Sequence, residues 1–165
     1  MISLLLATLL ISPSPSDSLA RRFAVAPAES LQVTAVGPTS GPAVVIIPGL
    51  VSPAYAFRKV LPLLTEAGLR AVVIEPLGVG QSGRPGDADY SHTAQAHRVA
   101  AVMDSLGLRQ AVVMGHAVGT AMALRLALAR PDLVKSLLLV EGGALESAAV
   151  PGVKRAIQFS FLVRL

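Results

Sequence analysis

A run of five residues in the middle of the chain has the spacing of a nucleophile turn. Gly115, His116, Ala117, Val118 and Gly119 follow a short apolar stretch of β-strand character and precede a longer stretch of helical character. This is the context of the G-x-S-x-G pattern, in which small glycines let a strand and a helix approach closely around a strained central residue. The serine position is occupied by Ala117, whose methyl group cannot attack a carbonyl carbon. The pattern therefore predicts an acyl-transfer geometry without a covalent nucleophile.

Two further loops follow apolar strands and are expected to converge on the same edge of a sheet. Pro48, Gly49 and Leu50 follow one strand, where a backbone N–H could face a developing oxyanion. The next strand is followed by a turn that contains Gly78, Gly80 and Ser82. Because ligands bind outside the carboxyl ends of parallel strands, these loops and the nucleophile turn predict one common site.

The general acid and base of such a site are harder to find. The three histidines, His92, His97 and His116, all precede position 117. His116 could act as a base for a bound water, but the turn should direct its side chain away from position 117, which favours a packing role. Glu141 ends the last apolar strand and is a weak alternative acid, since a glutamate at a strand end is more often a loop or cap residue.

A metal or cofactor site is not predicted. The chain has no cysteine, and His92 and His97 are five residues apart, so they do not share a helix face as a metal-binding pair would. Asp87 and Asp89 are two carboxylates in a short glycine- and proline-rich stretch, which a solvated turn explains more simply. No cofactor is implied.

The elements that must position these residues alternate between strands and helices. We expect strands that are mostly buried on both faces and helices between them, which is typical of a doubly wound, mostly parallel sheet in an α/β protein. The expected strands are Leu31–Val36, Ala43–Ile47, Arg70–Ile74, Ala111–Met114 and Ser136–Val140, and the expected helices are Tyr55–Ala67, Thr93–Leu106 and Val118–Arg130.

From Leu31 to Gly142, the order of these motifs resembles the α/β-hydrolase family, in particular its esterases and lipases. The resemblance implies that Leu50 and Val118 supply the two oxyanion-hole N–H groups and that Gly78, Gly80 and Ser82 match the family's Asp-x-x-Gly-x-Gly-x-Ser turn. Glu75 stands at the aspartate of that turn, and Pro48-Gly49 replaces a frequent His-Gly. Both are interpreted as tolerable changes, because these residues shape loops more than they take part in the chemistry. The family's acid and histidine follow the nucleophile, and we find no counterpart of the strands that carry them, so the sheet is expected to lack its C-terminal strands.

The chain divides into three expected parts. Its 165 residues, 53% hydrophobic and 15% charged, suit one folded core. Residues 1–22 are interpreted as a signal peptide or a flexible extension, residues 23–147 as a partial hydrolase core, and residues 148–165 as the start of a lid or an exposed tail. The protein would be secreted or periplasmic if residues 1–20 act as a signal, and cytoplasmic otherwise. Membrane contact is expected only through that segment.

Two functional hypotheses follow. The first is a protein resembling serine hydrolases that cleave esters or related acyl bonds, catalytically inactive as written. The second is a non-catalytic binding or interaction protein that holds a small apolar ester or carboxylate in the oxyanion-hole pocket. The net charge of +4 is scattered, so nucleic acid is not an expected partner. An exposed sheet edge after Ser136–Val140 predicts self-association.

Overall fold

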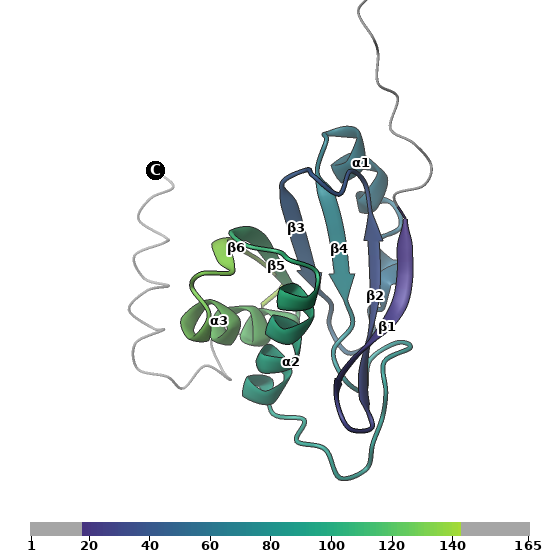
Figure 1. Ribbon diagram of the computed structural model, residues 1–165, viewed down its shortest axis with the longest axis vertical. Helices are drawn as coiled ribbons and strands as arrows, with labels where there is room; N and C mark the ends of the chain where they lie inside the picture. Colours follow the sequence, from purple (N-terminus) through teal and green to yellow (C-terminus); the bar gives the residue numbers. More distant parts are fainter. Residues whose placement is uncertain (1–17, 143–165) are drawn as a thin grey trace, which may run out of the picture.

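The computed structural model describes residues 18–142, which form one mixed sheet with helices on both faces (Figure 1). The sheet has six strands in the order β1-β2-β4-β3-β5-β6. Strands β4, β3, β5 and β6 are parallel, while β1 and β2 extend the sheet in antiparallel fashion. The strands are β1 (Leu19–Ala26), β2 (Glu29–Val36), β3 (Ala43–Ile47), β4 (Arg70–Ile74), β5 (Ala111–His116) and β6 (Val134–Val140). The predicted α/β class with a mostly parallel sheet is confirmed.

The helices cover the two faces unequally. They are the 3₁₀ helix η1 (Ala54–Phe57), α1 (Val60–Glu66), α2 (His92–Ser105) and α3 (Gly119–Ala129). In β3, Val45 and Ile47 face the larger core beneath α2 and α3, whereas Val44 and Ile46 face the smaller core beneath η1 and α1. This period-two alternation is what a strand buried on both faces requires. Figure 1 shows α2 and α3 side by side, and buried side chains of both helices belong to the larger core.

Local signals explain where the helices begin and end. Helix α2 begins after Ser91, whose Oγ accepts a hydrogen bond from the Ala94 N–H at 3.2 Å and so satisfies one otherwise unpaired amide. It ends just before Gly107, within one residue of the predicted end. Helix α3 ends at Ala129, just before Pro131, and most of its side chains are buried, as predicted.

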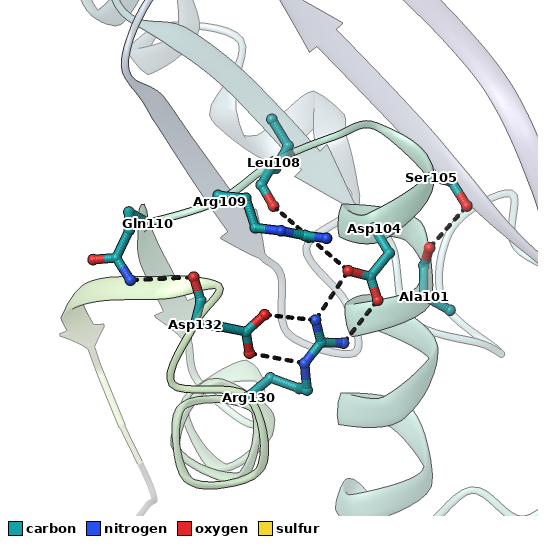
Figure 2. Close-up of polar contacts among 8 residues, drawn as sticks. All are labelled: Ala101, Asp104, Ser105, Leu108, Arg109, Gln110, Arg130 and Asp132. Atoms are coloured by element: carbon teal, nitrogen blue, oxygen red, sulfur yellow. Dashed lines mark hydrogen bonds and ion pairs between the residues drawn. The ribbon is translucent and has the colours of Figure 1, made fainter.

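A cluster of charged side chains joins the carboxyl-terminal ends of α2 and α3 (Figure 2). Arg130 contacts both carboxylate oxygens of Asp104, at 2.7 and 3.0 Å, and both oxygens of Asp132, at 2.7 and 2.9 Å. Arg109 Nη1 donates a further hydrogen bond to Asp104 Oδ1, at 2.6 Å. The hydrogen bonds from Arg130, and to a smaller extent the one from Arg109, lower the pKa of Asp104 to about 2, because they favour its charged form. The cluster lies away from the predicted site, at the amino-terminal ends of β5 and β6.

Two of the predicted elements differ from the structure. The expected helix Tyr55–Ala67 is two short helices, and Pro62 lies in the first turn of the second, where its missing N–H costs little. The expected strand Ser136–Val140 begins two residues earlier, at Val134, and is not buried on both faces. It is also the last strand of the described sheet, so no described strand pairs with its outer edge. Its Leu138 and Leu139 side chains are 47% and 38% exposed.

Strand β1 lies partly in the segment that was interpreted as a leader. It begins at Leu19 rather than near Phe23, and Leu19 pairs with Ala35 of β2. Residues Leu19–Arg22 thus belong to the sheet, while residues 1–17 of the expected leader, residues 143–147 of the expected core and the expected lid or tail 148–165 lie outside the described residues. None of the helices within residues 18–142 has the length and apolar character needed to span a membrane.

Candidate functional site: the turn at Ala117 and its two neighbouring loops

The predicted nucleophile turn is a sharp strand-to-helix connection. Strand β5 ends at His116, Ala117 adopts a left-handed backbone with φ of 50°, and α3 begins two residues later. The Ala117 N–H donates to the Val140 carbonyl at 3.0 Å, and the Ala117 carbonyl accepts from the Thr120 N–H at 3.1 Å. A left-handed conformation is strained for a residue with a Cβ, and these two bonds help to hold it in place.

The end of β3 packs directly against this turn. A Cβ on Gly119 would collide with the Ile47 carbonyl oxygen, so only glycine allows the strand and the first turn of α3 to approach this closely. A Cβ on Gly49 would lie 3.0 Å from the Ala117 methyl carbon, which places the Pro48–Leu50 loop beside position 117. The structure therefore brings together the Pro48–Leu50 loop and the turn at Ala117, two of the three connections that the sequence predicted to converge.

The two amides expected to form the oxyanion hole lie in these loops. Leu50 follows Gly49, and Val118 precedes the first residue of α3. Neither the Leu50 nor the Val118 N–H donates a hydrogen bond to any described residue. Amides at the start of a helix lack partners within the helix and attract negative charge. Both N–H groups are therefore available to an oxygen atom of a ligand.

The glycine-rich turn after β4 is built around Glu75 and Ser82. Ser82 Oγ donates to the Glu75 carbonyl at 2.7 Å and accepts from the Gln32 N–H of β2 at 2.8 Å. Gly78 and Gly80 both have positive φ, and a Cβ on Gly80 would overlap the Glu75 carboxylate. The residues of the motif thus shape the turn, as the sequence analysis assumed.

A second buried side chain, Gln95, holds the same turn and was missed by the sequence analysis. Its Oε1 accepts from the Leu77 N–H at 3.0 Å, and its Nε2 donates to the Leu77 carbonyl at 2.8 Å. The available signal was a polar residue next to the apolar positions Ala96, Val99 and Met103 of α2.

His116 and Glu141 form a pair at the ends of adjacent strands. His116 Nε2 lies 3.1 Å from Glu141 Oε2, and the imidazole meets the Phe57 ring edge-on, with centroids 6.1 Å apart. The Nδ1 atom is buried without a hydrogen-bond partner within the described residues. The packing role expected for His116 stays a prediction.

The remaining sequence candidates lie elsewhere. Asp89 accepts hydrogen bonds from the backbone N–H and from the Oγ of Ser91. The backbone bond, and to a smaller extent the hydroxyl bond, lowers the pKa of Asp89. Asp89 therefore orders the start of α2. His92 has a pKa lowered by burial and by the charge of Arg125. Asp87 and His97 are exposed. Across residues 18–142, no group of histidine, aspartate and glutamate side chains could hold a metal ion.

Comparisons with known proteins agree with this architecture. The sequence profile described as alpha/beta hydrolase fold matches residues 42–160. RutD of Variovorax paradoxus, named provisionally as a carbamate hydrolase, is 36% identical over 104 residues, which are 63% of this chain and 39% of that protein. An epoxide hydrolase of Caballeronia sordidicola is 34% identical over 109 residues, 66% of this chain and 32% of the relative.

Solved structures show the same fold. The haloalkane dehalogenase DbeA of Bradyrhizobium elkani superposes with a TM-score of 0.69 at 30% sequence identity, over 76% of this chain and 42% of the dehalogenase. Cfl2 of Burkholderia cenocepacia gives a TM-score of 0.71 at 27% identity, over 79% of this chain and 44% of Cfl2. The chain therefore spans less than half the length of these relatives. The family match, the sheet order and the turn at Ala117 together show that this chain belongs to the alpha/beta hydrolase fold family.

Proposed function

We propose that this chain binds a small apolar ester or carboxylate through its carbonyl or carboxylate oxygen and forms no acyl-enzyme. The observation that carries the proposal is the turn at Ala117, where the Pro48–Leu50 loop lies against a methyl group instead of a nucleophile. The Leu50 and Val118 N–H groups are the oxygen's partners in this proposal. Such donors stabilise an oxyanion without any covalent step.

The surface beside Ala117 supports an apolar ligand. Leu50 and Val51 are 68% and 93% exposed, and the Tyr55 ring is also largely exposed. Leu50 and Val51 belong to or directly follow the loop that approaches Ala117, and Tyr55 follows a few residues later, so we propose that they line the rim of the oxygen site. Apolar walls with a few directed polar groups are the usual composition of a small-molecule site.

The proposed chemistry of the whole protein is hydrolysis of an ester or a related acyl bond. The names of the matched relatives refer to a carbamate, an epoxide and a haloalkane, so they share a fold and differ in the bond that is cleaved. Ala117 cannot serve as the nucleophile of such a reaction, and we propose that the chain as written is catalytically inactive. Binding of a ligand without its conversion, as proposed above, uses the same oxygen site.

The binding proposal is tested by titrating the ¹⁵N-labelled chain with hexanoate, a small apolar carboxylate. We expect saturable shifts of the Leu50 and Val118 amide signals, because both N–H groups would gain a charged acceptor. Titration with 1-hexanol is the matched control, since it offers the same apolar chain without a carboxylate and should leave these two amides little changed. Hexanoate shifts that are absent, or that grow linearly without saturation, would contradict the proposal.

A further inference from the structure

Glu75 is a buried carboxylate that bridges two loops of the site. Its side chain follows β4 directly and the residue is only 3% exposed. Oε1 accepts a hydrogen bond from the Ala54 N–H at 2.8 Å, and Oε2 accepts one from the Gln81 N–H at 2.7 Å. Ala54 begins η1, at the end of the loop that carries Leu50, and Gln81 belongs to the glycine-rich turn.

Both acceptors of this carboxylate are used by backbone amides, and no described cation forms an ion pair with it. Taking a charge out of water is costly unless hydrogen bonds compensate, so a carboxylate at this position implies that both amide bonds matter to the fold of the loops. The absent Cβ of Gly80 leaves the space that the carboxylate occupies.

The bond to Ala54 continues toward the turn at Ala117. Helix η1 ends at Phe57, whose ring packs edge-on against His116, the residue before Ala117. The other end of the loop lies against Ala117 through Gly49. Glu75 therefore fixes one end of the segment Pro48–Ala54, and packing against the turn fixes the other.

We propose that Glu75 is a positioning residue that holds the Pro48–Ala54 loop, and with it the Leu50 N–H, in place for the ligand oxygen. This inference rests on the proposed function of that amide. Glutamine could not replace Glu75 without loss, because its NH₂ group would face one of two N–H donors. Aspartate is one methylene shorter and would not reach both loops in this backbone.

The test compares three variants of the full chain. Glu75→Gln removes one acceptor. Ala54→Pro removes the donor but leaves the carboxylate intact, and proline fits because Pro53 is extended (φ −62°, ψ 178°) and Ala54 is the first helical residue. Glu29→Gln is the matched control: it makes the same change from carboxylate to amide and weakens the ion pair with Arg98, but it touches neither Glu75 nor the Pro48–Ala54 loop.

Two readouts separate this inference from the binding proposal. The first is hydrogen exchange of the Ser52 N–H, which donates to the Gly49 carbonyl at 3.3 Å within the loop. The second is hexanoate affinity. We expect Glu75→Gln and Ala54→Pro to speed Ser52 exchange and to weaken hexanoate binding, each by about tenfold, the size expected for a lost hydrogen bond to a charged group. Glu29→Gln should change neither by more than about twofold.

Unchanged Ser52 exchange in Glu75→Gln would overturn the positioning role. If Glu75→Gln does not fold, Ala54→Pro decides in the same way, and a folded Ala54→Pro variant with unaltered exchange also overturns it. If the unaltered chain binds no hexanoate, the proposed function fails, while Ser52 exchange still reports whether Glu75 holds the loop.

Discussion

One imidazole nitrogen of His116 faces the Glu141 carboxylate, and the other nitrogen is buried. Nε2 lies 3.1 Å from the Glu141 carboxylate, and Nδ1 lies in the interior without a partner among the described residues. A general base must reach the proton that it removes, either directly or through one water. His116 is the sequence neighbour of Ala117, but its Nε2 is already paired with Glu141.

Restoring a serine at the turn should therefore restore no catalysis. We expect Ala117→Ser to hydrolyse p-nitrophenyl acetate within about threefold of the rate of the unaltered chain, because a hydroxyl without a base is a weak nucleophile. A working nucleophile and base are worth roughly a millionfold in a serine protease. Initial rates at pH 7 to 8 measure the difference, and Ala117→Gly controls for the space that the methyl group occupies. A rise of a hundredfold in the serine variant would show that a base lies within reach.

The charged cluster between α2 and α3 should make stability depend on acid pH. Hydrogen bonds from Arg130 and Arg109 hold the pKa of Asp104 at about 2, below the ordinary value of 3.8. A lowered folded-state pKa contributes stability above the ordinary pKa, and that contribution is lost as the pH falls toward the folded-state value. The urea midpoint of the unaltered chain should therefore fall more steeply between about pH 4 and pH 2 than the midpoint of Asp104→Asn.

Asp87→Asn is the control for this comparison, because Asp87 is an exposed carboxylate outside the cluster. The pH profile of this variant should follow that of the unaltered chain. Since the cluster is exposed, high salt should narrow the difference between Asp104→Asn and the unaltered chain. Parallel profiles for these two proteins across the acid range would show that Asp104 gains nothing from its arginine partners.

The buried amide of Gln95 should contribute more to stability than its size suggests. Gln95→Leu fills the space of the glutamine side chain with an apolar group, but it leaves the buried N–H and carbonyl of Leu77 without partners. Leaving two such groups unsatisfied costs about 3 kcal/mol. Urea unfolding measures the change, and Gln81→Leu, at an exposed side chain, should stay within about 0.5 kcal/mol. Equal stability of the two variants would mean that water replaces the lost partners of Leu77.

We propose that the outer edge of β6 mediates self-association. Strand β6 pairs only with β5 among the described strands, and it exposes Leu138 and Leu139 beside unpaired backbone groups. Exposed apolar edge strands pair readily with other chains. Light scattering after size exclusion should show mass rising with concentration, and Leu138→Lys with Leu139→Lys should lower it. Leu128→Lys, at an exposed leucine of α3, should have no such effect. A chain that stays monomeric at all concentrations would refute the proposal.

The sequence predicted the central strands well because they are short, continuous apolar runs between glycine- or proline-containing turns. Strands β3 and β4 have the predicted bounds, and β5 extends two residues further to His116. Strand β1 was missed because Arg21 and Arg22 interrupt its alternation and only Phe23 is buried, as is common at a sheet edge. Its identity as a strand depends on pairing with β2, which the pattern of its own residues does not encode.

The site was predictable where backbone geometry demands a particular residue, and less so where a side chain serves the backbone. The glycines around Ala117 have a spacing that only a tight strand-to-helix turn requires. Glu75 was interpreted as a tolerated replacement that shapes a loop, yet its two amide partners lie 21 residues before it and six residues after it. No local pattern joins Ala54, Glu75 and Gln81, so their contact emerges only from the fold.

The close approach of Gly119 to the Ile47 carbonyl also bears on how a ligand can enter. The strand that leads into the Pro48–Leu50 loop is in contact with the first turn of α3, so neither can move far without the other. A ligand that displaced Ile47 or Pro48 at the base of the loop would have to lift the helix from the sheet and expose the buried Met122 and Leu126. We therefore expect a preorganised receptor whose free and occupied backbones superpose, with little affinity lost to rearrangement.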